Sequence, residues 1–293
     1  MAAEMSELEQ LNAAAAKGAM APGKVSDSLR PRIDELDLWR NVEELREQGA
    51  TVVTDAVPLD LLDELRAVIH QGIESHGRAG PSGVPTCGKL LGNAVVDRVV
   101  TSPKLLAMWE YSAGKGMRAG TISGTILKQS EAGAEYIGVP IHADHAWLPQ
   151  PFPEHNCVAT ICLPCEGMTE AEGATRFVPG SNLHRRLPSA EEAAEAKSIP
   201  LVVPKGGFAM WGGSTWHATG VRTVPGVRTM LHASCQRLYT QPVHDFTHLL
   251  RDEAYLAAAP EAMRGLLGAD LFFGPESNPD PEKVAKTLLM AQQ

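Results

Sequence analysis

The stretch that decides the fold is residues 199–235, "IPLVVPKGGFAMWGGSTWHATGVRTVPGVRTMLHASC". It consists of short runs rich in apolar and β-branched residues, and glycine or proline separates each run from the next. That rhythm is typical of all-β sandwiches and barrels, in which tight turns join short strands. The same texture begins after Gly116, so we predict a β-sandwich core over about 117–241.

Helical patterns flank this core on both sides. In 33–48 and in 58–73, apolar residues recur at the spacing of one helix face. A further helix is expected over 94–114, with a break near Pro103, because proline interrupts a helix. Helical patterns return after Pro242, so the predicted core lies between two sets of helices.

The chain is expected to fold as one unit with an N-terminal tail. Residues 1–30 are rich in alanine, glycine and small polar residues, which have little to bury, so we expect a disordered tail. No repeat or linker interrupts the rest, and we predict a single domain over 31–293.

Charge and hydropathy limit the classes of partner. The formal net charge is -9 and no stripe of lysine and arginine is present, whereas nucleic-acid binding needs clustered positive charge. No run reaches the roughly 18 uncharged apolar residues of a membrane span, and the first residues lack the pattern of a secretory signal. We therefore expect a cytoplasmic protein whose partner is a small molecule, not a nucleic acid or a membrane.

The five cysteines do not suggest a disulfide framework, because their number is odd and the chain is long. Cys162 and Cys165 form a CxxC pair, but no second pair follows at the spacing of a zinc site. Cys162 lies in the apolar run "CVATICLPC", so we interpret it as a thiol packed within a strand.

Two histidines and an aspartate crowd into residues 139–149, "VPIHADHAWLP". On a strand, residues two apart point to the same face, so His142 and Asp144 are expected to project together. His145 is expected to face away from them, at the rim or in a surface or core position, and not to be a ligand. His217, in a later run, is the third candidate ligand. Two histidines and one carboxylate form the facial triad of non-haem Fe(II) oxygenases, which leaves positions open for other ligands.

Each of these signals is weak alone, since HxD is common by chance and a lone histidine is more often a hydrogen-bonded core residue. The residues after His217 strengthen them: Thr219 follows two positions later and Arg228 eleven positions later. A guanidinium group binds a carboxylate through two hydrogen bonds, and a hydroxyl can add another. A metal site with such a clamp beside it predicts an acidic co-substrate that chelates the metal.

Four motifs, taken in order, make the pattern more specific. They are HAD at 142–144, "GATRFVPGS" at 173–181, "PKGGFAMWGGSTWH" at 204–217, and Arg228. In order and spacing they resemble the phytanoyl-CoA dioxygenase family of Fe(II)/2-oxoglutarate-dependent oxygenases. The similarity runs from about Ile33 to Gln241, and the helical tail is similar to that of members that oxidise terpenoids and alkaloids.

The resemblance implies a mainly β fold with flanking helices, built on a double-stranded β-helix, or jelly-roll, core. It implies that His142, Asp144 and His217 bind Fe(II), with 2-oxoglutarate and dioxygen as co-substrates. Arg228, helped by Thr219, would hold the distal carboxylate of 2-oxoglutarate. Thr175 matches a position that contacts the co-substrate in some members. The helical tail makes dimer contacts in relatives, so a homodimer is an open expectation.

The chain departs from the family pattern at three positions around the co-substrate. Relatives often carry glutamine three residues before the first histidine, where this chain has Val139. The usual PGSH motif has Asn182 in place of its histidine, and the usual KGD motif ends in Gly207. These departures concern contacts to the co-substrate and leave the three metal ligands intact.

Apolar and aromatic residues near the HxD motif predict an apolar substrate site. The candidate lining residues are Trp147, Tyr136, Leu148 and Met210, and the alternative for each is an ordinary core role.

These observations predict a dioxygenase that hydroxylates, desaturates or rearranges a small apolar metabolite while 2-oxoglutarate is converted to succinate and CO2. Two alternatives stay open. One is a metal-dependent, cupin-like isomerase or hydrolase that does not use 2-oxoglutarate, and the other is a binding module without catalysis. Arg228 argues against the first, because that chemistry needs no carboxylate clamp, and the intact triad argues against the second.

Overall fold

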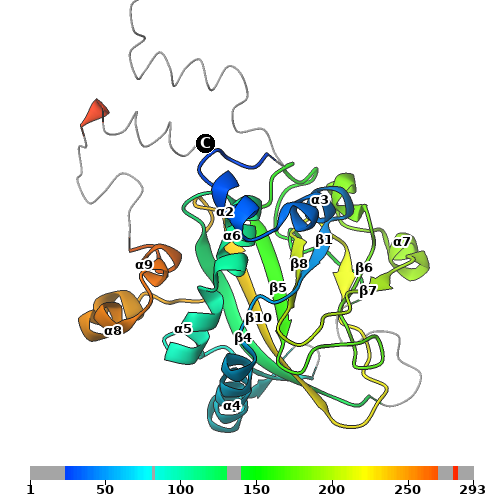
Figure 1. Cartoon of the computed structure of the whole chain (residues 1–293). Coiled ribbons are helices and arrows are strands. Elements are labelled where there is room, and N and C mark those ends of the chain that lie inside the picture. The colour runs from blue at the N-terminus through cyan, green and yellow to red at the C-terminus, as the bar shows by residue number, and fades with distance from the viewer. Residues whose placement is uncertain (1–23, 81–82, 131–139, 270–279, 283–293) are drawn as a thin grey trace, which may run out of the picture.

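The computed structural model describes residues 24–80, 83–130, 140–269 and 280–282 (Figure 1). A seven-stranded antiparallel sheet forms the centre, with helices on one side and a three-stranded sheet on the other (Figure 1). Within the described part of the chain, no helix is long and apolar enough to cross a membrane.

The N-terminal segment contributes two short helices, one edge strand of the large sheet and then a longer helix. These elements are α2 (Arg30–Glu35), α3 (Trp39–Gln48), β1 (Ala50–Val53) and α4 (Leu59–His76). The single helix expected over 33–48 is divided, because Asp37 adopts a left-handed conformation with φ 53°. Gly49, with φ 86°, ends α3 and turns the chain directly into β1. The expected tail over 1–30 lies mostly outside the described residues, but Leu29 is buried against the core.

The next segment confirms the break expected near Pro103. A short hairpin of β2 (Arg78–Ala79) and β3 (Pro85–Cys87) precedes α5 (Ala94–Val100) and α6 (Pro103–Ala113). The Asn93 side chain caps α5 by accepting a hydrogen bond from the Val95 N–H. The two strands of the hairpin are only two and three residues long and lie in a stretch rich in glycine and proline.

The β-strands pass repeatedly between the two sheets. The large sheet contains β4 (Arg118–Lys128), β5 (Val158–Pro164), β8 (Phe208–Gly212) and β10 (Val227–Gln236), in the order β1-β8-β5-β10-β4-β3-β2. The small sheet contains β6 (Arg176–Phe177), β7 (Ile199–Pro200) and β9 (His217–Ala218), in the order β7-β6-β9. An isolated bridge pairs His142 with His217 at its edge. This arrangement confirms the predicted double-stranded β-helix.

Strand alternation gives the large sheet two different faces. On β10, Leu231, Ala233 and Cys235 pack into the main core with residues of the helices. Arg228 and His232 point to the opposite face, toward the small sheet. Polar residues are therefore gathered between the two sheets, while the apolar core lies between the large sheet and the helices.

Short helices complete the fold. They are η1 (Ser181–His184), α7 (Ala190–Glu195), η2 (Leu249–Arg251), α8 (Glu253–Ala258) and α9 (Ala262–Leu267). The last three confirm the helical pattern predicted after Pro242, and Met263 and Leu266 of α9 join the main core.

Candidate metal centre

His142, Asp144 and His217 lie together between the two sheets. One ligand atom from each lies within 4.8 Å of the others. The Nε2 atom of His217 is 3.6 Å from Oδ1 of Asp144, and the two imidazole rings are 4.4 Å apart, centre to centre. The three predicted ligands are thus close enough for one metal ion to bind all of them.

Backbone hydrogen bonds bring the two histidines together. The His142 N–H donates to the His217 carbonyl at 3.0 Å, and the His217 N–H donates to the His142 carbonyl at 2.9 Å. Asp144 lies in the turn that follows, which the hydrogen bond from the His145 N–H to the Gly213 carbonyl (2.8 Å) holds in place. The predicted strand through His142 and Asp144 is therefore wrong, because Asp144 reaches the site from a turn.

Each ligand histidine is oriented by a backbone carbonyl. His142 Nδ1 lies 2.8 Å from the Pro140 carbonyl oxygen, and His217 Nδ1 lies 3.0 Å from the Thr215 carbonyl oxygen. A carbonyl only accepts, so Nδ1 carries the proton in both rings and Nε2 keeps its lone pair. This is the arrangement that protein ligands to a metal commonly show.

Asp144 is held by two donors from the large sheet. Thr160 Oγ1 donates to Asp144 Oδ2 at 2.7 Å, and Trp211 Nε1 donates to the same oxygen at 3.1 Å. Oδ1 is the carboxylate oxygen that faces His217. The two hydrogen bonds therefore select which oxygen is presented to a metal.

Two of the candidate ligands, Asp144 and His217, have pKa values shifted by their surroundings. Burial raises the pKa of Asp144, but the nearby His217 and the Thr160 hydrogen bond outweigh it, and the net pKa lies below its usual value. Burial lowers the pKa of His217 to about 4, against the opposing effect of Asp144. Near neutral pH the carboxylate is charged and this imidazole is neutral, so neither must lose a proton on metal binding.

The donor set fits Fe(II). Two neutral imidazoles and one carboxylate on one face suit the octahedral iron of non-haem oxygenases, with positions left for other ligands. The nearby Cys162 does not supply a thiolate, because burial raises the pKa of its thiol to about 12. The residues present therefore match the iron site that the sequence predicted.

Arg228 is a buried cation without a counter-ion among the described residues. Its side chain is on β10 and is only 2% exposed. Nη1 donates to the Gly173 carbonyl, and Nε has no hydrogen-bond partner in the described structure. Burial lowers its pKa to about 10, so the guanidinium stays charged at neutral pH. A buried, incompletely bonded guanidinium is costly unless an anion pairs with it, which suits a carboxylate ligand.

The two threonines expected beside the co-substrate differ in their surroundings. Thr175 is buried, and its hydroxyl lies 3.9 Å from Cys162 Sγ. Thr219 is half-buried after β9, and its hydroxyl bonds to none of the described residues. Their contacts to 2-oxoglutarate stay predictions.

His145 has a structural role. Its ring is fully buried, with Nδ1 3.0 Å from Ser214 Oγ, and Nε2 accepts a hydrogen bond from the Cys157 N–H at 3.0 Å. It also packs edge-on against Phe152. The ring therefore anchors the turn that carries Asp144, and its buried position agrees with the expectation of a core role and not of a ligand.

The predicted substrate residues are scattered in their placement. Trp147 is 63% exposed, although it is only three positions after Asp144. Leu148 is half-buried and packs against a small apolar cluster that includes Phe152. Tyr136 and Val139 lie outside the described residues. Trp147 and Leu148 stay predictions for substrate binding.

Met210 does not line the candidate site. Its side chain is fully buried in the main core on the helical face of β8. The next residue, Trp211, points to the opposite face and bonds to Asp144. Strand alternation therefore assigns Met210 to packing, which corrects the expectation that it contacts substrate.

Thr160, which donates to Asp144 as Trp211 does, was not identified as a site residue from the sequence. It lies in the apolar run of β5, where every residue is buried. A buried hydroxyl needs a hydrogen-bond partner, so a lone threonine in such a strand is a signal for a polar contact. The identity of the partner, Asp144, comes only from the fold.

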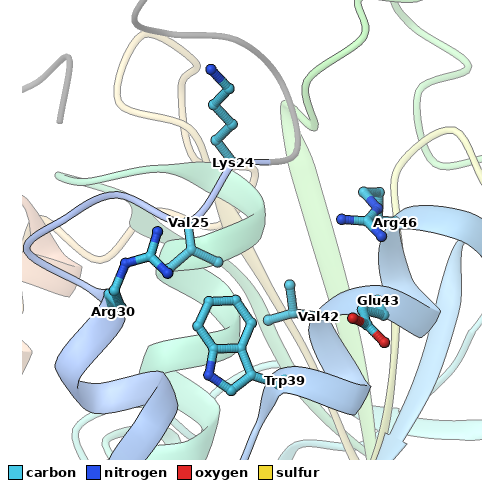
Figure 2. A pocket seen from close by; sticks show the side chains of 7 residues that line it. All are labelled: Lys24, Val25, Arg30, Trp39, Val42, Glu43 and Arg46. Atoms are coloured by element: carbon cyan, nitrogen blue, oxygen red, sulfur yellow. The ribbon is translucent and has the colours of Figure 1, made fainter.

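A separate surface pocket of about 460 Å³ lies at the N-terminal helices (Figure 2). The Arg30 guanidinium lies 5.4 Å from the ring centre of Trp39, and Lys24 and Arg46 also line the pocket. The metal-binding residues are not part of its lining, so this pocket is distinct from the candidate metal centre.

Solved structures with the same fold share low sequence identity with the chain. The non-haem α-ketoglutarate-dependent epimerase SnoN from nogalamycin biosynthesis superposes with a TM-score of 0.57 at 20% identity, covering 70% of this chain and 84% of that one. SnoN has also been solved in complex with Fe3+, α-ketoglutarate and nogalamycin RO. The carbocyclase SnoK from the same biosynthesis gives 0.54 at 17% identity, covering 73% and 90%. These likenesses show the fold.

The family is shown by the sequence itself. The model of the phytanoyl-CoA dioxygenase (PhyH) family matches residues 45–230, which is more than half of the chain. The matched region contains the metal centre, Thr160, Trp211 and Arg228. The chain therefore belongs to the phytanoyl-CoA dioxygenase family of enzymes, which depend on iron and 2-oxoglutarate.

Proposed function

We propose that the protein is an Fe(II)/2-oxoglutarate-dependent dioxygenase that oxidises a C–H bond of a small apolar metabolite. The product is hydroxylated, desaturated or rearranged, and 2-oxoglutarate becomes succinate and CO2. The observation that carries the proposal is the pairing of a His-Asp-His centre with Arg228, a buried guanidinium that has no counter-ion among the described residues.

The protein residues hold the reacting groups in place. His142, Asp144 and His217 would bind iron through two Nε2 atoms and Oδ1, because hydrogen bonds occupy the other polar atoms of these side chains. Arg228 would bind the distal carboxylate of 2-oxoglutarate. When bound, the iron supplies the oxidation chemistry, and the protein supplies position and exclusion of water.

The substrate class rests on two supports. Trp147 is 63% exposed on the turn that carries Asp144, three positions after that carboxylate, and ligand sites are commonly lined by aromatic side chains. SnoN and SnoK act in nogalamycin biosynthesis, and SnoN has been solved with nogalamycin RO bound. We therefore propose a small apolar metabolite of secondary metabolism as substrate, with Trp147 and Leu148 beside it.

One experiment separates the proposed dioxygenase from the alternative. The alternative is a cupin-like isomerase or hydrolase that uses the metal without 2-oxoglutarate. Purified protein is mixed with Fe(II) and 2-oxoglutarate without oxygen, and the visible charge-transfer band of the chelate is recorded. We expect the band in the wild type and a large loss of it in Arg228→Ala. Release of succinate after air is admitted then separates an enzyme from a binding module.

Arg237→Ala is the matched control for Arg228→Ala. Arg237 comes directly after β10, the strand that carries Arg228, and is partly buried. Its guanidinium donates to the backbone carbonyls of Asn156 and Ser112. Its loss is expected to reduce stability and to leave the band. Absence of the band in the wild type, or an unchanged band in Arg228→Ala, would contradict the proposal.

A further inference from the structure

The inner face of β5 places a cysteine next to the residue that anchors Asp144. Thr160 donates to Asp144 Oδ2, and Cys162, two residues further along the strand, lies on the same face. Cys162 pairs across the sheet with His232 of β10 and Ala209 of β8. Its position is therefore in the centre of the large sheet, on the face that carries the metal ligands.

Two opposite charges act on the Cys162 thiol. Burial raises its pKa, the positive charge of Arg228 lowers it, and the negative charge of Asp144 raises it. The thiol also accepts a contact from the Thr175 hydroxyl at 3.9 Å. Cys162 is thus within electrostatic reach of both the metal-binding carboxylate and the guanidinium.

The thiol itself satisfies neither of these charges. It stays protonated at neutral pH, so it is neither a metal ligand nor a counter-ion for Arg228. The Arg228 Nε atom is buried without a partner in the described structure, which suits a guanidinium that binds an anionic ligand. Thr160 pairs with Ser234 and Cys162 with His232, so along the inner face of the sheet Cys162 lies between Thr160 and the level of Arg228.

We propose that Cys162 forms the floor of the co-substrate site and that its small side chain sets the room available to the carbon chain of the 2-oxo acid. This inference rests on the proposed function, since it assumes that 2-oxoglutarate joins the metal centre to Arg228. It assigns a specificity role to a residue that the sequence pattern presents only as a packed thiol.

A larger and a smaller side chain at position 162 should have different effects on co-substrate binding. In Cys162→Leu, the extra carbons extend from the inner face of the sheet into the cluster that Cys162 shares with Met168 and Ala174. The Kd for 2-oxoglutarate should rise by about tenfold or more, as expected for overpacking. In Cys162→Ala, loss of the sulfur atom leaves more room for the carbon chain. The ratio of the Kd for 2-oxoglutarate to the Kd for 2-oxoadipate, which is one methylene longer, should therefore move severalfold in favour of 2-oxoadipate. In both variants the affinity for the metal should stay within about threefold, because the three ligands are untouched.

The control is Cys235→Leu. Cys235 is fully buried on β10, but its side chain points into the main core on the other face of the same sheet. The steric disturbance is matched, whereas the co-substrate site is not touched. We expect this variant to lower the melting temperature and to leave the Kd for 2-oxoglutarate within about twofold of the wild type.

The measurement is isothermal titration calorimetry with Mn(II) in place of Fe(II), so that binding is read without turnover. Titrations with 2-oxoglutarate and with 2-oxoadipate are made for the wild type and the three variants. An unchanged Kd in Cys162→Leu, or equal weakening in Cys235→Leu, overturns the role of Cys162. If Cys162→Leu fails to fold, an unchanged preference in Cys162→Ala overturns it instead. No binding of 2-oxoglutarate by the wild type overturns the proposed function, and the inference with it.

Discussion

The indole N–H of Trp211 donates to Oδ2 of Asp144 at 3.1 Å, the same oxygen that accepts from Thr160 at 2.7 Å. Both donors come from adjacent strands of the large sheet, where Thr160 and Trp211 are cross-strand partners. The carboxylate is therefore fixed by a rigid sheet, although Asp144 itself lies in a turn. The sheet decides which oxygen of Asp144 faces His217.

Removal of the indole donor should weaken metal binding. In Trp211→Phe the ring is kept and the hydrogen bond to Asp144 is lost, so the carboxylate can rotate. We expect a metal affinity lower by about tenfold, within the usual range for loss of a partner that orients a ligand. The measurement is a calorimetric titration with Mn(II).

Trp109→Phe is the matched control for that experiment. The Trp109 ring is fully buried on α6, and its Nε1 atom has no partner in the described structure. Its replacement removes an indole N–H that holds nothing, so the metal affinity should not change. Equal loss of affinity in both variants would show that Trp211 acts only through packing.

The Thr160 hydroxyl should contribute to the same orientation. Thr160→Val keeps the shape and removes the donor to Asp144. We expect a loss of metal affinity of similar size, and the double variant with Trp211→Phe should lose less than the sum of the two, because both donors act on one oxygen. Thr229→Val is the control, because it removes from β10 a buried hydroxyl that bonds to His70 of α4. Strict additivity in the double-mutant cycle would contradict a shared role.

Acid should destabilise the metal-free protein through His145. Burial lowers the pKa of His145 to about 4, from an ordinary value of 6.5. Between these two values the unfolded chain binds more protons than the folded one, so stability falls as pH decreases from about 6.5 to about 4. The full effect is on the order of 3 kcal/mol for a shift of this size.

The pH effect is checked by chemical unfolding of wild type and His145→Gln at a series of pH values. The glutamine cannot titrate, so its free energy of unfolding should change less with pH, although His217 still contributes through its own lowered pKa. Parallel slopes in wild type and His145→Gln would exclude His145 as the source.

Trp147 should matter for substrate and not for stability. Its side chain is 63% exposed, so Trp147→Ala is expected to change the free energy of unfolding by less than about 0.5 kcal/mol. The KM for the substrate identified by succinate release should rise severalfold, because an apolar contact surface is lost. Leu59→Ala, which removes a similarly exposed apolar residue at the start of α4, should change neither quantity. An unchanged KM in Trp147→Ala would remove this residue from the substrate site.

The sequence was informative wherever a local pattern has one common physical cause. Glycine and proline between β-branched runs predicted the two-sheet core, and Pro103 predicted the break between α5 and α6. The order of HxD, His217 and Arg228 predicted the metal site and the family, because ligand type and spacing depend on chemistry that is carried by the residues themselves.

Other features depended on contacts between distant segments. The helix expected over 33–48 is divided at Asp37, and the expected strand through His142 and Asp144 ends in a turn held by His145 and Gly213. The periodicity of apolar residues did not predict the break at Asp37 or the turn at Asp144. A left-handed residue, or a turn held by another strand, leaves no local pattern in the sequence.

The sequence by itself determined the residue types of the site: two imidazoles and a carboxylate for iron, and a guanidinium for an acidic co-substrate. Only the tertiary structure decided which residues of each strand face the site and which face the main core. Alternation on β8 sends Met210 to the core and Trp211 to Asp144, and alternation on β5 places Cys162 beside Thr160. The physical reason is that strand register is set by pairing across the whole sheet, so a shift of one residue would exchange the two faces.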